Sequence, residues 1–428
     1  MQSRIFKLIL LIVTFIVNNS ANSQSDKKMT YKEYLSEGAP TKKEIDVFLN
    51  DLSWARFDGE LGYILGNYLP HDGFEGSSTI STSAESGARS SQLYDDRPSR
   101  INTYGNSFTQ CHQVSDGETW QEYLAAHLGE PIRNFGMGGY GVYQAYRRML
   151  REESTENNAE NIVLYIWGDD HIRSLLRCRY MLFREWRDRQ AKKEGEGIMF
   201  HGNFWANIEM DLETGAFVEN DSRIGSEAEL YQMTDPDWLY ENLETDWALQ
   251  MYLYKQGKIN KIDLVNIKKL SGHLDLKLSW EPEDLKASVG TLLDHYAFEA
   301  TKNILNKSKV FAETNNKNLL IVLFDPYQVL RELLQEKPRY DQPIVDFLDE
   351  NGFRYFDANL EHLKDYQDFN LSVDDYFKRY FIGHYSPTGN HFFAYKLKKY
   401  LLEMLEPKPI TYQKGDVEST DFEGYLEK

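Results

Sequence analysis

The sequence predicts an α/β fold in which helices cover both faces of a central, mainly parallel sheet, so that the domain has three layers. Two short apolar runs, at 162–167 and 319–324, are as continuous as strands that are buried on both faces. Between residues 100 and 405, strand-like segments alternate with segments of helical periodicity. Since a parallel connection has to cross back over one face of the sheet, this alternation favours a parallel sheet with helices on either side.

The individual elements follow from local patterns. Strands are expected at 100–104, 132–135, 162–167, 319–324 and 353–356. Helices are expected after residue 115, and at 140–153, 344–348 and 387–405. Ser115 and Glu118 have the spacing of a capping box, and the helix that follows carries apolar residues every four positions until Gly129. The alternation therefore holds along most of this region.

A long insertion separates the two continuous apolar runs. About 150 residues lie between them, far more than one crossover needs. A hairpin is expected at 204–218, turning at 213–215, and helices are expected within 236–270. We place the insertion at about 180–300 and expect an α+β structure. Elements inserted at the carboxyl edge of a parallel sheet commonly shape a binding cleft.

The two ends of the chain differ from this core region. Residues 1–23 have a basic start, an apolar run at 8–17 and small residues at 21 and 23, which predicts a cleavable signal peptide. Residues 24–99 are expected to form an N-terminal arm. Within it, Thr41 and Glu44 form a capping box pattern, and the Gly- and Ser-rich stretch 57–95 favours loops and small hairpins. The main α/β domain is expected to span 100–405, and 406–428 is a polar tail.

Composition and charge restrict the partners. The formal net charge of −19 becomes −21 without the two basic residues of the signal segment, and an acidic surface repels nucleic acid. We expect a secreted or periplasmic protein without stable membrane insertion. A local arginine cluster at 173–187 still allows an anionic polysaccharide. The aromatic content of 14% indicates an aromatic-rich core, or alternatively exposed platforms for sugars. The oligomeric state is left open.

Cysteine and ligand patterns give no sign of a metal or cofactor. Cys111 and Cys178 lack zinc-ligand spacing, and either bridge to each other or remain buried free thiols. The glycines at 136, 138, 139 and 141 do not match the dinucleotide-binding pattern. We therefore expect neither a metal nor a cofactor.

Two distant segments carry the chemistry of nucleophilic catalysis. Ser107 follows the first expected strand, and His384 precedes the final helix. A serine hydroxyl becomes an effective nucleophile when an imidazole takes its proton, and only the fold can bring these two residues together. His112 is a rival base, although an offset of five residues along a helix faces it away from Ser107.

With these segments in place, the chain resembles the SGNH/GDSL hydrolase superfamily, as a divergent member, over roughly 100–171 and 317–405. The first block of that family is usually Gly-Asp-Ser, and here it is Gly105-Asn106-Ser107. In the second block, at 134–139, the resemblance assigns an oxyanion-binding amide to Gly139. It implies a flavodoxin-like α/β/α fold, with Ser107 as nucleophile, His384 as base and the Ser107 amide as a second oxyanion donor.

The third and fourth blocks depart from the family pattern. Where the family has an oxyanion-binding Asn, this chain has Asp170, followed by His171, which we expect to line the cleft. A carboxylate repels an oxyanion, so Asp170 is expected to be protonated, to bind a cation, or to orient His171 or another group. The acid that usually precedes the histidine by three residues is absent. Asp375 is the expected replacement and Asp374 the alternative; a backbone carbonyl could equally orient the base, which would leave a Ser–His dyad.

The function expected from this pattern is that of an exported serine esterase. The substrate would be a small-molecule or polysaccharide ester, most plausibly an acetylated carbohydrate, since export and aromatic content both suit one. Two alternatives remain open at this point. One is an O-acyltransferase that acts on a sugar, and the other is a non-catalytic carbohydrate-binding protein on the same fold.

Overall fold

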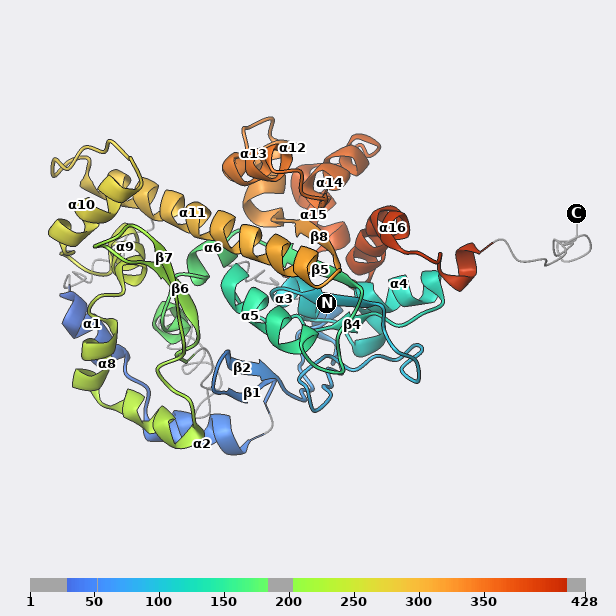
Figure 1. Ribbon diagram of the computed structural model, residues 1–428, viewed down its shortest axis with the longest axis horizontal. Coiled ribbons are helices and arrows are strands. Elements are labelled where there is room, and N and C mark those ends of the chain that lie inside the picture. The colour runs from blue at the N-terminus through green and yellow to red at the C-terminus, as the bar shows by residue number, and fades with distance from the viewer. Residues whose placement is uncertain (1–28, 52, 184–202, 414–428) are drawn as a thin grey trace, which may run out of the picture.

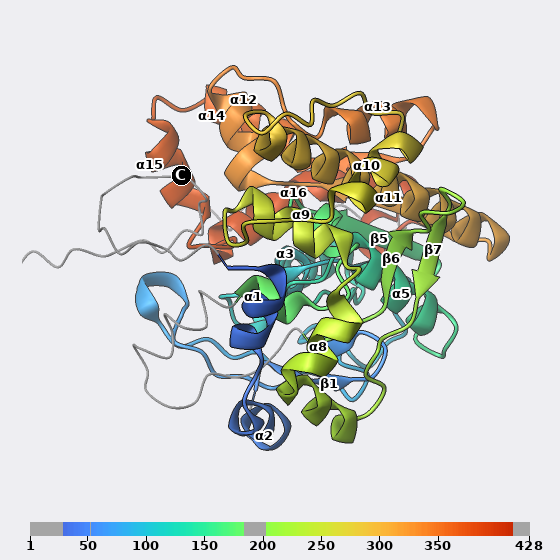
Figure 2. The ribbon, with the colours of Figure 1, turned by 90° about the vertical axis from the view of Figure 1, so that its left-hand side faces the viewer.

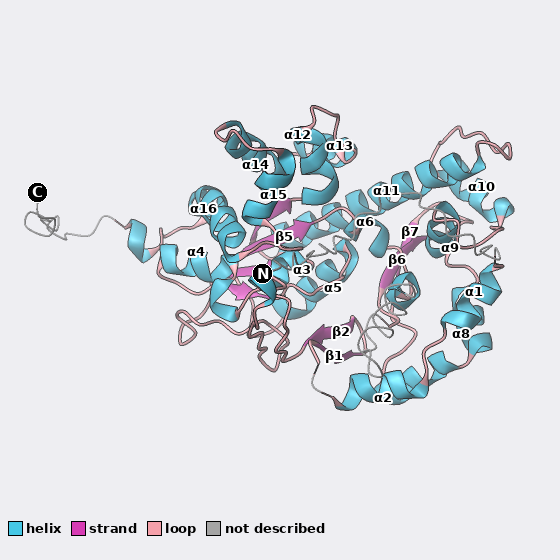
Figure 3. Ribbon diagram, turned by 180° about the vertical axis from the view of Figure 1, so that it is seen from behind, coloured by secondary structure: helices cyan, strands magenta, loops and turns pink. Residues whose placement is uncertain are grey.

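The computed structural model describes residues 29–51, 53–183 and 203–413. These residues form a five-stranded, wholly parallel sheet with helices on both faces (Figure 3). In spatial order the strands are β4 (Arg133–Asn134), β3 (Ile101–Tyr104), β5 (Asn161–Ile166), β8 (Asn318–Leu323) and β9 (Tyr355–Asp357). The α/β class and the parallel sheet are therefore as predicted.

Side chains of the central strands alternate between two cores. In β5, Ile162, Leu164 and Ile166 enter one core, and Val163 and Tyr165 enter the other. The next strand, β8, divides its apolar residues in the same way. Both sets are buried, which explains why these segments are continuously apolar in the sequence.

Different helices cover the two faces. One face is covered by α4 (Trp120–Leu128), α14 (Ala358–Gln367), α15 (Val373–Tyr380) and α16 (Pro387–Met404). The opposite face is covered by α5 (Val142–Glu153), α11 (Leu285–Thr314) and α13 (Gln342–Glu350). Short helices connect these elements: α3 (Ser107–Gln110), α6 (Asp170–Arg173) and α12 (Arg331–Leu334).

A second group of elements lies beside the sheet, toward the left of Figure 1. From the insertion it contains the hairpin β6 (Asn207–Met210) and β7 (Phe217–Asn220), with α8 (Pro236–Leu243), α9 (Trp247–Lys255) and α10 (Leu264–His273). From the arm it contains α1 (Tyr31–Gly38), α2 (Lys42–Asn50) and the hairpin β1 (Ala55–Asp58) and β2 (Gly62–Leu65). The long helix α11 runs from this group to the sheet.

The N-terminal arm and the insertion pack against each other. Figures 1 and 2 both show α1 beside α8, where the Tyr31 hydroxyl donates a hydrogen bond to the Leu243 carbonyl at 2.8 Å. The Tyr231 hydroxyl reaches Asp46 on α2 at 2.6 Å. The arm is therefore an integral part of the structure and does not lie loosely on its surface.

Most predicted elements occur within two residues of their expected positions. The capping boxes at Thr41 and Ser115 are present, although the second one closes a single turn and the helix itself begins after Thr119. Gly129 ends that helix with a φ of 74°, as expected for a glycine C-cap. The helices α1, α11, α14 and α15 were not predicted. The expected signal peptide lies outside the described residues, as does most of the expected tail.

Candidate active site

Ser107 lies at the carboxyl end of β3, where a tight turn leads into α3. Gly105 has a φ of 154°, and a Cβ at this position would lie 2.3 Å from Thr109 Oγ1. A glycine is therefore required for the chain to turn this closely against α3. Asn106 caps the helix, because its Oδ1 accepts a hydrogen bond from the Phe108 amide at 2.8 Å. This turn presents the Ser107 side chain, which is partly exposed.

The structure brings His384 to this serine. His384 Nε2 lies 2.7 Å from Ser107 Oγ, although the two residues are 277 positions apart. His384 stands in a short loop between α15 and α16, and its ring packs against Phe108, with 4.9 Å between the ring centroids. The geometry matches the hydrogen bond that a general base makes with a serine nucleophile.

The other nitrogen of His384 contacts Gln113 and not an acidic residue. Gln113 Oε1 lies 2.9 Å from His384 Nδ1 and also accepts the His384 backbone N–H at 2.8 Å. The expectation that Asp375 supports the base is wrong, because Asp375 binds Ser372 and Lys378 at the exposed start of α15. Asp374, the alternative, forms an ion pair with Arg331. Both aspartates turn away from His384.

The hydrogen bonds of Gln113 determine the tautomer of His384. Gln113 Nε2 donates to the carbonyls of Asp72 and Ile382, at 3.0 and 3.1 Å, so the amide oxygen must face His384. An amide oxygen only accepts hydrogen bonds, and His384 Nδ1 therefore carries the hydrogen. The lone pair of Nε2 is left to face the Ser107 hydroxyl, as proton abstraction requires.

A left-handed turn places Gln113 behind the histidine. The helix α3 ends after one turn, and Cys111 and Gln113 then have φ values of 60° and 74°. The buried Arg89 holds this turn by donating to the carbonyls of Gln110, Cys111 and Val114. Non-glycine residues with positive φ cost about 1–3 kcal/mol each and are concentrated at functional sites. The contacts of Arg89 therefore stabilise a turn that would otherwise be unfavourable.

His384 is held in its neutral form. Burial lowers the pKa of His384 well below 6.5, and the neighbouring His112 and Arg173 lower it further. A neutral imidazole can accept the proton of Ser107 directly. In the usual triad a carboxylate raises this pKa, whereas the Gln113 amide carries no charge to do so.

The glycine-rich loop after β4 lies against α3. The Met137 amide donates to the Gly105 carbonyl, and the Gly138 amide donates to Gln110 Oε1 at 2.6 Å. Gly139 has a φ of 85°, and a Cβ there would meet the Arg179 guanidinium at 2.0 Å. Among the described residues, the backbone N–H groups of Ser107 and Gly139 meet no hydrogen-bond acceptor. Both amides are therefore available to a ligand.

Asp170 has a structural role in place of the expected contact with substrate. It is 1% exposed, and its carboxylate accepts hydrogen bonds from Asn106 Nδ2, the Trp167 amide and Arg173. Through Asn106 it fixes the turn that carries Ser107. The carboxylate is fully engaged in these contacts, so its assignment to the oxyanion site is wrong, whereas the expectation that it orients another group is confirmed, with Asn106 as that group.

The expectation that His171 lines the cleft is also wrong. It is 4% exposed, with Nδ1 2.9 Å from Thr301 Oγ1 and its ring against Phe298, both on α11. Burial lowers the pKa of His171 to about 3. This residue joins α6 to α11 and does not reach the cleft. The expected arginine cluster is likewise internal where it is described, since Arg177 pairs with Glu209.

The buried carboxyl of Asp170 gives a testable dependence of stability on pH. Burial raises its pKa to about 7, so between about pH 4 and 7 it ionises in the unfolded chain but not in the folded one. The folded state therefore loses stability as pH rises through this window. Asp170→Asn cannot ionise, and its free energy of unfolding relative to wild type should rise by up to about 4 kcal/mol from pH 4 to 7. Urea unfolding at several pH values measures this, and a constant difference would contradict it.

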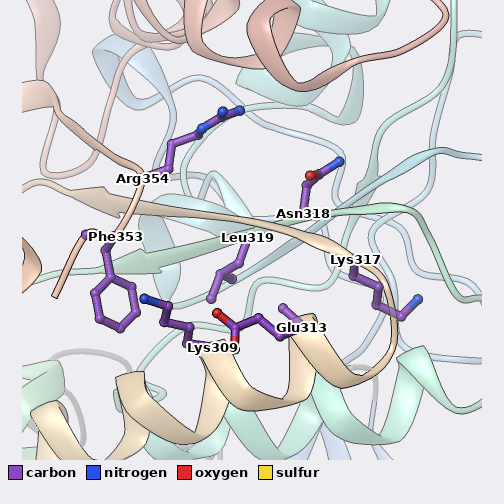
Figure 4. A pocket seen from close by; sticks show the side chains of 9 residues that line it. Lys309, Glu313, Lys317, Asn318, Leu319, Phe353 and Arg354 are labelled. Atoms are coloured by element: carbon purple, nitrogen blue, oxygen red, sulfur yellow. The ribbon is translucent and has the colours of Figure 1, made fainter.

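The best-formed cavity lies away from the turn that carries Ser107. A cavity of about 210 Å³ is lined by residues of α11, β8 and the turn before β9, including Lys309, Lys317 and Arg354 (Figure 4). It lies at the amino end of β8, whereas Ser107 follows the carboxyl end of the parallel strand β3. Cys111 and Cys178 are both buried free thiols. The two cysteines therefore do not form a disulfide with each other. Burial also raises the pKa of Cys111 to about 12, which disfavours a reactive thiolate.

A metal site and a membrane-spanning helix are both absent from the described part of the chain. No three His, Cys, Asp or Glu side chains there are grouped as metal ligands. None of the helices described combines the length and the hydropathy needed to cross a bilayer.

No protein-family model matches the sequence, and no curated protein matches it. The site is therefore interpreted from its own geometry. The sequence assigned Ser107 and His384 to one site, where the structure brings them together, but it gave no assignment for Gln113 or Asp72. The one available signal was the position of Gln113 close after the Gly-Asn-Ser turn, and glutamine is not a usual partner for a catalytic histidine.

Proposed function

We propose that this protein is a serine esterase of the SGNH type, in which Ser107 attacks an ester carbonyl and His384 is the general base. The observation that carries the proposal is the contact of 2.7 Å between Ser107 Oγ and His384 Nε2, with His384 Nδ1 bound to an acceptor. The nucleophile, the base and the orienting group are thus joined in the order that acyl transfer requires. The arrangement therefore favours catalysis over a purely binding role.

The fold and the location of the site support the same proposal. The strand order, numbered within the sheet, is 2-1-3-4-5, which flavodoxin-like proteins share. In such sheets, ligands bind outside the carboxyl ends of the strands where the order reverses, between β3 and β5. Ser107 follows β3 directly, and Asp170, which steadies its turn, follows β5. The two free amides of Ser107 and Gly139 would stabilise the oxyanion.

The substrate class is an acylated alcohol, and an acetylated carbohydrate suits the surroundings best. The half-buried Trp54 lies against Gly138, so closely that a Cβ added to this glycine would lie 3.0 Å from the indole ring. Asp72, whose carbonyl accepts a hydrogen bond from Gln113, also belongs to the arm. An aromatic side chain at the edge of a site is a group that commonly receives a sugar ring. Most other large aromatic side chains are buried in the two cores, so the aromatic content as a whole is not an argument for sugar binding.

The test is whether Ser107 reacts as a nucleophile. The purified protein should hydrolyse p-nitrophenyl acetate and release acetate from acetylated xylan, and a fluorophosphonate probe should label it at Ser107. Ser107→Ala should lose both activities and the label, while Ser115→Ala on the next turn should keep them. Labelling without hydrolysis, with transfer to an added sugar, would identify an acyltransferase. Neither label nor activity would contradict the proposal.

A further inference from the structure

We propose that His112, paired with Asp72, is a second acid–base residue of this site and protonates the alcohol that leaves the ester. The inference rests on the proposed esterase function and adds to it the means to expel a strongly basic leaving group, such as a sugar alkoxide. The two histidines of the site have different kinds of partner. The carboxylate near the site supports His112, and the base His384 is supported by a neutral amide.

His112 lies directly beside the base. Its ring centroid is 5.2 Å from that of His384, with an angle of 73° between the ring planes. Its backbone N–H donates to the Ser107 carbonyl at 3.0 Å, which ties it to the nucleophile turn. Its side chain is 27% exposed, so part of the ring is open to solvent. The helix α3 ends at Gln110, and the left-handed turn therefore returns His112 toward the serine, contrary to the expected helical offset.

The pairing of His112 leaves one nitrogen for substrate. Its Nε2 lies 3.1 Å from Asp72 Oδ2, so a protonated His112 forms an ion pair there. Its Nδ1 makes no hydrogen bond with any residue in the described ranges 29–51, 53–183 and 203–413. Asp72 belongs to both networks, because its carbonyl accepts a hydrogen bond from the Gln113 amide that holds His384. One loop of the arm thus fixes both imidazoles.

The two imidazoles divide the protons of the reaction between them. In acylation, Ser107 Oγ bonds to the carbonyl carbon and gives its proton to His384 Nε2. The bond to the alcohol oxygen then breaks, and this oxygen takes the Nδ1 proton of a doubly protonated His112, which is left neutral with its Nε2–H on Asp72. In deacylation, a water oxygen bonds to the acyl carbon and gives its proton to His112. The bond to Ser107 breaks, and His384 returns its proton to Oγ, so the enzyme ends in its starting state.

The dependence on leaving group tests this division. General acid catalysis contributes roughly 100-fold or more where the leaving oxygen is strongly basic, and little where it leaves as a stable anion. His112→Gln should therefore lower kcat/KM for acetylated xylan by roughly 100-fold, and for p-nitrophenyl acetate by less than about 10-fold. Asp72→Asn should show the same preference with smaller losses, since the imidazole remains. His391→Gln, at an exposed position on α16, is the matched control and should behave as wild type.

The outcomes separate this inference from the proposed function. Equal losses on both esters in His112→Gln, with Ser107 still labelled by the fluorophosphonate probe, would overturn the role of His112 and leave the esterase intact. Retention of full activity on acetylated xylan would overturn it as well. If the wild type neither reacts with the probe nor hydrolyses p-nitrophenyl acetate, the esterase function itself fails, and the role of His112 fails with it.

Discussion

Replacing His384 by alanine should lower kcat for ester hydrolysis by at least about 10³-fold, and replacing Ser107 by alanine should have a similar effect. The hydrogen bond of 2.7 Å between them is the route by which the serine proton leaves, so either substitution removes the same step. For this reason the double variant should be hardly less active than either single one. Steady-state kinetics on p-nitrophenyl acetate, with circular dichroism to verify folding, measures both effects.

The matched control for this prediction is Asp375→Asn. The sequence favoured Asp375 as the acid of the triad, but its carboxylate binds Ser372 and Lys378 at the surface. Its removal should change kcat by less than about twofold, as is usual for surface substitutions that break no buried contact. A loss in Asp375→Asn comparable to that in His384→Ala would show that the contacts of the base differ from those described.

Gln113 should be the third most important residue of the site. Gln113→Ala removes the acceptor for His384 Nδ1–H and for the His384 backbone amide, so the ring is free to change tautomer and orientation. We expect a loss of roughly 100-fold in kcat, because misplacement of a catalytic group by about 1 Å has an effect of that size. The same assay measures it, and Gln328→Ala, at an exposed position in the turn after β8, serves as control. An unchanged kcat would show that the ring is held by packing alone.

A second substitution of Gln113 distinguishes orientation from charge. His384 must be neutral to act as a base, and since its pKa lies well below 6.5, the acid limb of kcat/KM should lie below pH 6.5 in wild type. Gln113→Glu places a carboxylate beside Nδ1–H, which favours the imidazolium and raises the pKa of His384. The acid limb should then move to higher pH by about one to two units. A limb that does not move would show that this residue does not contact His384 in solution.

The positions of strands and helices could be predicted largely from the sequence. Burial on both faces requires continuous apolar runs, and β5 and β8 show them; burial on one face requires helical periodicity, and α4, α5 and α16 show it. The helix α11 was missed, although its buried positions 289, 292, 293, 296, 297 and 300 recur at helical spacing. The glycine at 290 and the scattered polar residues obscured that pattern.

The site could be predicted only in part. Ser107 and His384 carry recognisable neighbours, and a nucleophile and a base have few alternatives among the side chains. Gln113 was missed because the expected helix would have carried it away from Ser107, whereas the chain leaves that helix after one turn. Asp170 was misjudged for a related reason. Its position in the sequence fits the oxyanion site, but its contacts to Asn106, Trp167 and Arg173 turn the carboxylate inward.

The sequence by itself determined the α/β class, the parallel sheet and the pair of residues proposed for catalysis, because local apolar periodicity and short motifs record burial and turn geometry directly. Only the tertiary structure decided which groups surround that pair: Gln113 behind His384, Asp72 beside His112, and Asp170 beneath the serine turn. These contacts join segments of the arm, the first crossover and the last loop. No local pattern encodes them, because each depends on where the folded chain places segments that lie far apart in sequence.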